Sequence, residues 1–151
     1  MRTTSEENKA LARRFGEAMN TRQLHLLDEI VAPDFSRHCQ ATPEVDVRSL
    51  EQFKDFLRAD AAAFPDSVQT VKHLLAEGDL VAVWATYAGT QRGRMGPFPP
   101  SGKRMQVDFG AVLRVENGRI AELWVTWDNV TALAQLGHLP APPDKMRVES
   151  V

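Results

Sequence analysis

The stretch IAELWVTWDNVTALAQLG, residues 120–137, changes from a strand pattern to a helix pattern without a linker. Its first eight residues alternate as a β-strand does, and one face is wholly apolar: Ala121, Leu123, Val125 and Trp127. Residues 130–136 form a short helix pattern, and Gly137 is a suitable residue just beyond a helix end. Asp128 lies at the junction, where it could cap the helix or serve as an acid or base in a pocket.

The chain upstream of this stretch shows helix patterns first and strand patterns afterwards. Apolar residues recur at helical spacing in residues 3–20, 22–31 and 49–64. Residues 34–49 look irregular, apart from a short extended piece at 35–38. Alternating patterns then cover residues 67–76, 80–90 and 104–115, and an Asn-Gly turn precedes the last strand. This order predicts an α+β fold, with the helices on one face of an antiparallel sheet.

Composition narrows the class of protein. The 151 residues are 43% hydrophobic with a formal net charge of -2, so no electrostatic argument favours nucleic acid or an anionic membrane surface. No apolar run approaches the roughly 20 residues of a membrane span, and the polar N-terminus has no signal-peptide segment. We therefore expect a cytoplasmic protein, with one domain over residues 1–137 and a Pro-rich tail over residues 138–151.

Several kinds of site are missing from the sequence. Cys39 is the only cysteine, so no internal disulfide is possible. No histidine has a partner at metal-ligand spacing, which argues against a metal site. There is no nucleotide-binding fingerprint, no Gly-x-Ser-x-Gly and no Ser-His-Asp pattern, which argues against a cofactor and against a covalent hydrolase.

The second face of the last two strands combines aromatic and ionisable residues. Trp124 shares this mixed face with Asp128, and Asp108 lies on the matching face of the strand before. The mixed face could simply be exposed, but an exposed tryptophan wastes roughly 150–250 Å² of burial. We therefore expect the mixed face to line a cavity under the helices. The wholly apolar face then needs another cover, which predicts a homodimer through the sheet.

Five segments in this order resemble the SnoaL-like polyketide cyclases of the nuclear-transport-factor-2-like superfamily. They are DFSRH, AFPD, AEGDLVAVWATYAGT, FPPSGK and NGRIAELWVTWDNVTALAQLG, which together span about residues 30–137. The resemblance implies a curved antiparallel sheet wrapped by helices into a cone, with an internal cavity and often dimerised through the sheet. It also implies an intramolecular aldol condensation that closes a ring of a polyketide ester.

The resemblance also suggests site residues. The family's catalytic aspartate matches Asp128, and the histidine of its F..H motif matches His38. Two positions depart from the family pattern: Gln91 stands where a histidine is frequent, and Trp84 where a basic residue is frequent. A carboxylate beside Trp124 on a cavity wall would be desolvated, so we expect a raised pKa for Asp128.

The remaining candidates come from the residues themselves. Asp108 could form an ion pair with a neighbour or be a second polar group in the cavity. Trp84 and Trp124 would form pocket walls, whereas Phe109 points the other way. Residues 91–103 form a long loop in which Met95 and Phe98 could cover the cavity mouth.

Together these observations predict a cofactor-independent acid/base enzyme that acts on a hydrophobic, carbonyl-bearing small molecule. Asp128 would enolise the substrate, and His38 or Asp108 would stabilise the oxyanion. Two alternatives remain open. One is a non-catalytic binding protein for a small molecule, and the other is a hydratase or epoxide-opening enzyme in the same cavity.

Overall fold

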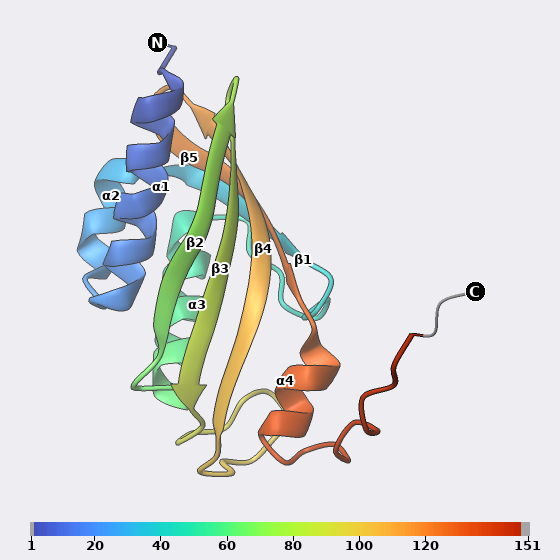
Figure 1. Cartoon of the computed structure of the whole chain (residues 1–151). Helices are drawn as coiled ribbons and strands as arrows, with labels where there is room; N and C mark the ends of the chain where they lie inside the picture. The colour runs from blue at the N-terminus through green and yellow to red at the C-terminus, as the bar shows by residue number, and fades with distance from the viewer. Residues whose placement is uncertain (1, 149–151) are drawn as a thin grey trace.

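A single five-stranded sheet carries the fold, and helices pack on it (Figure 1). The structure, a computed structural model, describes residues 2–148. The strands lie in the order β1-β5-β4-β3-β2. Their bounds are β1 (Val31–Cys39), β2 (Val68–Glu77), β3 (Leu80–Thr90), β4 (Arg104–Glu116) and β5 (Arg119–Trp127). The helices are α1 (Ser5–Asn20), the 3-10 helix η1 (Leu24–Leu26), α2 (Leu27–Ile30), α3 (Leu50–Ala63) and α4 (Asn129–Gln135).

The strand β1 is the main difference from the fold predicted from the sequence. The four predicted strands are found in place and pair antiparallel, but β1 adds a fifth at the sheet edge, parallel to β5. The sequence predicted only a short extended piece at 35–38. Pro33 lies inside β1, where the pairing with β5 shifts register between Val31 and Ser36. An edge strand tolerates proline because its outer N–H groups need no partner in the sheet.

The apolar rows of the strands face the helices, which reverses the expected orientation of the sheet. Leu113 and Leu123 are buried in one core with Phe15 of α1 and Phe53 of α3. The expectation that the mixed face lines a cavity under the helices is therefore wrong. A wholly apolar row stabilises the fold most when the protein's own helices cover it, so this row gives no reason for a partner subunit. We use the term outer face for the mixed side of the sheet.

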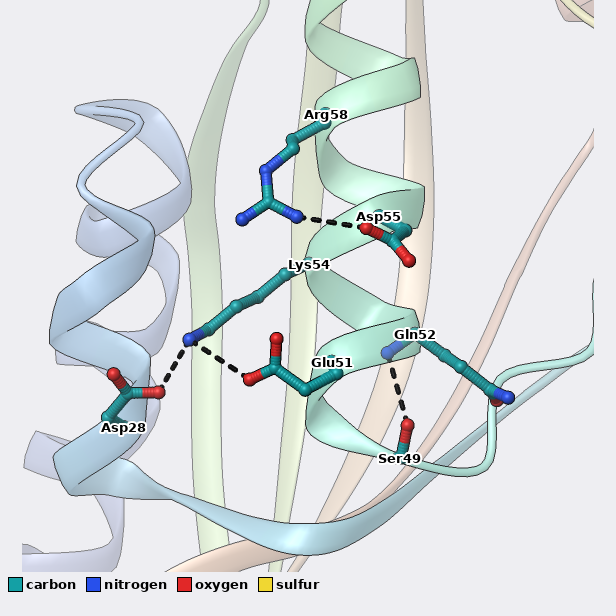
Figure 2. A network of polar contacts seen from close by, with 7 residues as sticks. All are labelled: Asp28, Ser49, Glu51, Gln52, Lys54, Asp55 and Arg58. Atoms are coloured by element: carbon teal, nitrogen blue, oxygen red, sulfur yellow. Dashed lines mark hydrogen bonds and ion pairs between the residues drawn. The ribbon is translucent and has the colours of Figure 1, made fainter.

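The helix α3 is held in place by specific contacts at its start and along its side (Figure 2). The Ser49 hydroxyl accepts a hydrogen bond from the backbone N–H of Gln52 at 3.1 Å, which satisfies one free donor of the first turn. Lys54 is buried and donates to Asp28 of α2 at 2.6 Å. Lys54 thus fixes α3 against α2, and this positions the side chains that α3 directs at the sheet.

The other helix ends follow the sequence signals. Thr4 caps α1 through a capping box with Glu7. Gly137 follows α4 with φ +84°, a backbone conformation in which glycine avoids steric strain. Among the helices of residues 2–148, none is both long and apolar enough to cross a membrane.

Candidate functional site

The outer face of the sheet carries both predicted pocket tryptophans. Trp84 is 46% exposed and Trp124 is 39% exposed, so neither forms the wall of an internal cavity. A Cβ at Gly110 would lie 3.3 Å from the Trp84 ring, and glycine there lets the ring lie close to the sheet. A shallow groove of about 530 Å³ lies along β1, β3, β4 and β5, and its lining combines outer-face residues such as Trp124 with inward residues such as Val125. The two tryptophans are therefore not inside a cavity under the helices, and their contact with substrate stays a prediction.

His38 lies on the outer face beside Trp124. Its Nε2 is 2.6 Å from Oε2 of Glu122, and its ring stacks on Trp124 with centroids 5.7 Å apart. Glu122 also accepts a hydrogen bond from Arg114 at 3.1 Å. These contacts hold the pKa of Glu122 below its usual value, the hydrogen bond from His38 most of all. The structure therefore brings His38 and Trp124 together, as part of an ion-pair network.

Asp108 also lies on the outer face and already has two partners. Thr86 donates its hydroxyl to the carboxylate at 2.8 Å, and Lys72 donates at 3.1 Å. These bonds, with that from Thr86 first, lower the pKa of Asp108. Asp108 is thus a paired surface carboxylate, which agrees with the ion-pair alternative considered for it, although the partner is Lys72.

Asp128 is the N-cap of α4. Its carboxylate accepts the backbone N–H of Thr131 at 3.1 Å and the Thr131 hydroxyl at 2.6 Å. The two bonds lower the pKa of Asp128, the hydroxyl bond more. The expected raised pKa is therefore wrong, because the carboxylate is exposed and hydrogen-bonded. A catalytic role for Asp128 stays a prediction.

The long loop 91–103 is closed by Gln91 and by the first residue of the tail. Gln91 is fully buried and donates its amide to the carbonyls of Gly93 and Phe98, both at 3.2 Å. Its side-chain oxygen lies 2.7 Å from Nε2 of His138, whose ring contacts Phe98 at 4.9 Å between centroids. Met95 packs beside the second core cluster. Gln91 thus holds the loop together, and a contact of Gln91, Met95 or Phe98 with substrate stays a prediction.

A partly buried polar pair between α3 and the sheet was not predicted from the sequence. The Tyr87 hydroxyl of β3 donates to Oδ2 of Asp60 on α3 at 3.0 Å. Burial raises the pKa of Asp60, and the bond from Tyr87 and the charges of Arg37 and Arg22 oppose that rise only in part. Burial also raises the pKa of Tyr87, so this hydroxyl remains a donor. Among the carboxylates of residues 2–148, Asp60 has the surroundings that are typical of an acid/base group.

A recess gives access to this pair from the helix side of the sheet. Its volume is about 280 Å³, and Asp60 is its lining carboxylate. The end of α1, the following turn, α3 and the start of β2 form its walls, including Met19, Asn20, Arg22, Leu57 and Ser67. Arg22 holds the wall together by donating to the carbonyls of Phe64 and Ser67 at 3.3 and 3.4 Å. The recess therefore combines apolar walls with a few polar groups, as ligand sites do.

Arg37 of β1 lies on the other side of Asp60, under α3. It is only 6% exposed, its guanidinium lies 4.3 Å from the centre of the Phe56 ring, and Cys39 is its neighbour on the strand. Burial lowers the pKa of Arg37, and the nearby Cys39 and Asp60 oppose this. Its Nη1 has no hydrogen-bond partner among residues 2–148. The layer between α3 and the sheet therefore contains one carboxylate, one phenol and one buried cation.

The position of Asp60 in the sequence could have identified it as a candidate site residue. Asp60 lies seven residues after Phe53 and four after Phe56, which places it on the apolar stripe of α3. A carboxylate on a buried helix face is costly unless it has partners. Arg37 could have been found in the same way only if β1 had been recognised as a strand. Within residues 2–148, no three His, Cys, Asp or Glu side chains gather to hold a metal ion.

Comparisons with known proteins agree with this fold. IdmH from Streptomyces antibioticus is 34% identical, with 86% of this chain and 98% of IdmH covered and a TM-score of 0.76. TsrD from Streptomyces laurentii is 27% identical, with coverage of 91% and 99% and a TM-score of 0.81. AclR from Streptomyces galilaeus is 28% identical, with coverage of 93% and 87% and a TM-score of 0.79. No match was found among curated proteins.

The family assignment rests on most of the chain. The family model described as SnoaL-like polyketide cyclase matches residues 9–136, which include every strand and the cap of α4. The resemblance inferred from five sequence segments is confirmed, as is the nuclear-transport-factor-2-like α+β fold. The chain belongs to the SnoaL-like polyketide cyclase family.

Proposed function

We propose that the protein is a cofactor-independent acid/base enzyme for a hydrophobic, carbonyl-bearing small molecule, with Asp60 as the proton-accepting group. The observation that carries the proposal is the position of Asp60, which lines the recess under α3 and is partly buried there, and this burial raises the pKa of its carboxyl. A carboxylate that binds its proton more tightly is a better base toward a carbon acid next to a carbonyl.

The contacts of Asp60 suit proton transfer. Tyr87 occupies Oδ2, and within residues 2–148 no hydrogen bond is made to Oδ1. One oxygen is therefore fixed in place while the other is available to take a proton. The Tyr87 hydroxyl also prevents the carboxylate from rotating, so less reorganisation is needed during the reaction.

The family membership supports the reaction class. IdmH is a proposed polyketide cyclase. An aldol-type ring closure begins when a base removes a proton from the carbon beside a carbonyl, and Asp60 would perform that step here. The recess of about 280 Å³ is at the small end of ligand sites, which favours a compact ring system or one end of a longer molecule.

Proton exchange tests the proposal without knowledge of the natural substrate. The protein is mixed with 2-acetylnaphthalene in D₂O, and NMR follows the loss of the methyl protons. Asp60→Asn should lower the catalysed rate by roughly 10²–10⁴-fold. Asp55→Asn is the matched control, because Asp55 is on the same helix but exposed and paired with Arg58 (Figure 2).

Two outcomes would favour other functions. Full exchange activity in a folded Asp60→Asn protein would remove Asp60 as the base and return attention to Asp128, His38 and Asp108. A wild-type protein that binds the ketone but catalyses no exchange would support a non-catalytic binding protein.

We also propose that a second copy of the chain covers the outer face, so that the protein is a homodimer through the sheet. The support comes from Trp84 and Trp124, which leave large apolar rings exposed beside the shallow groove. Exposed aromatic patches of this kind favour association. This assigns the dimer contact to the mixed face instead of the apolar row considered first.

A further inference from the structure

The unpartnered nitrogen of Arg37 is the starting point. The side chain is 6% exposed, and its Nη1 is buried without a hydrogen-bond partner among residues 2–148. An unpaired N–H of a buried cation is among the more costly features of a fold. Sites of this kind are retained when a ligand or an ion supplies the missing acceptor.

The surroundings of Arg37 define what that acceptor can be. The Phe56 ring, with its centre 4.3 Å from the guanidinium, holds the cation by a cation–π contact and supplies no acceptor for Nη1. The carboxylate of Asp60 is near enough for its charge to act on Arg37, but it is bonded to Tyr87 and forms no ion pair with Arg37. Cys39 and Asp60 act on the guanidinium, but neither forms an ion pair with it, so the cation favours a further oxygen that carries negative charge.

The position of Arg37 relative to Asp60 relates it to the proposed function. Both groups lie in the layer between α3 and the sheet, Arg37 on β1 and Asp60 on α3. In β1 the neighbouring inward residue, Cys39, pairs with Val125 of β5, and Val125 and Cys39 are only partly buried. Phe56, which contacts the Arg37 guanidinium, lies four residues before Asp60 on α3, so Arg37 and Asp60 are neighbours in this layer.

We propose that Arg37 binds the carbonyl oxygen of the substrate and stabilises the enolate that forms when Asp60 removes the neighbouring proton. This inference rests on the proposed function of Asp60. When Asp60 takes the proton, the C–H bond breaks, its electron pair forms the C=C bond, and the C=O pair becomes the oxyanion beside Arg37. The proton resides on Asp60 and no other reactant is needed. The enolate carbon can then attack a second carbonyl of the same molecule, and the new alkoxide takes the proton back from Asp60, which restores the carboxylate.

Binding of an enolate mimic tests this assignment separately from catalysis. The probes are 2-naphthoate and its neutral match 2-naphthamide, titrated by isothermal calorimetry. The wild type should prefer the anion, and Arg37→Gln should weaken naphthoate binding by roughly 10-fold or more with little effect on the amide. Arg14→Gln, at an exposed position of α1 where Arg14 pairs with Glu29, should leave both affinities unchanged. Asp60→Asn mimics the protonated aspartic acid and should bind naphthoate more tightly than the wild type.

A second measurement covers the case in which Arg37→Gln fails to fold. In wild-type protein with ¹⁵N-labelled arginine, naphthoate should shift the side-chain resonance of Arg37 and leave that of Arg14 in place. Three results would each contradict the proposed role of Arg37. They are equal binding of the two probes, no binding of naphthoate to the folded wild type, and an unshifted Arg37 signal. If Asp60→Asn loses proton exchange but the wild type shows no preference for the anion, Asp60 remains the proposed base. Only the role of Arg37 is then rejected.

Discussion

The Tyr87 hydroxyl lies 3.0 Å from Oδ2 of Asp60, and this bond joins the central sheet to α3 at a place where a carboxylate is partly buried beneath the helix. Burial raises the pKa of Asp60, and the hydrogen bond from Tyr87 is the largest opposing effect. Burial and the hydrogen bond from Tyr87 therefore act in opposite directions on the pH at which Asp60 loses its proton.

Removing the Tyr87 hydroxyl should raise the pKa of Asp60 further. Tyr87→Phe keeps the ring and deletes only the donor that stabilises the carboxylate. In the proton-exchange assay, the pH at which the rate reaches half its plateau should move upward in Tyr87→Phe. An unchanged or lower half-plateau pH would show that Tyr87 does not govern the ionisation that matters.

Asp60→Asn should stabilise the protein at neutral and higher pH. The folded state binds the Asp60 proton more tightly than the unfolded chain, so the ionised carboxyl costs stability. That cost is absent below the unfolded pKa of about 3.9 and grows as the pH rises through the folded pKa. The melting temperature of Asp60→Asn should exceed that of the wild type at pH 8 and match it at pH 3. A lower melting temperature at pH 8 would contradict the raised pKa.

The exposed face of the sheet should control association. Replacing Trp84 and Trp124 together by Glu places charges on the outer face and should convert a dimer into a monomer in sedimentation velocity. Val130→Glu is the control, because Val130 is 68% exposed on α4, away from the sheet face. A monomeric wild type at micromolar concentration, or a double variant that stays dimeric, would reject this interface.

His138 should restrain the loop 91–103. Its ring nitrogen meets Gln91 at 2.7 Å and its ring contacts Phe98. His138→Ala should therefore increase hydrogen exchange at the Phe98 and Met95 amides, which bond to each other's carbonyls. His25→Ala, an exposed position in η1, should leave their exchange unchanged. Equal protection in His138→Ala and the wild type would mean that Gln91 alone closes the loop.

Elements of the fold that depend on local sequence patterns could be predicted from the sequence. Helix caps at Thr4 and Ser49, the Asn-Gly turn and the last four strands follow from spacing and turn chemistry. The strand β1 was not recognised because Pro33 and the register shift beside it interrupt alternation. Its pairing with β5 is parallel and long-range, so no nearby turn indicates it.

The orientation of the sheet could not be read from the strands alone. An alternating strand shows two faces but does not say which one the helices cover. The exposed area of Trp84 and Trp124 seemed too costly to leave on a surface, and that argument placed the mixed face inside. In the structure the wholly apolar row is the one buried against α1 and α3. Asp60 was missed for the same reason, since its importance depends on which face of the sheet lies under α3.

The central claim is that the acid/base group is Asp60 and that Asp128 is the cap of α4. The most direct test compares Asp60→Asn and Asp128→Asn in the exchange of 2-acetylnaphthalene protons, with melting temperatures to show that both fold. Asn caps a helix about as well as Asp, so Asp128→Asn should keep both the fold and the wild-type rate. Asp60→Asn should keep the fold and lose roughly 10²–10⁴-fold in rate. The opposite pattern, with the rate lost in Asp128→Asn and retained in Asp60→Asn, would contradict the account.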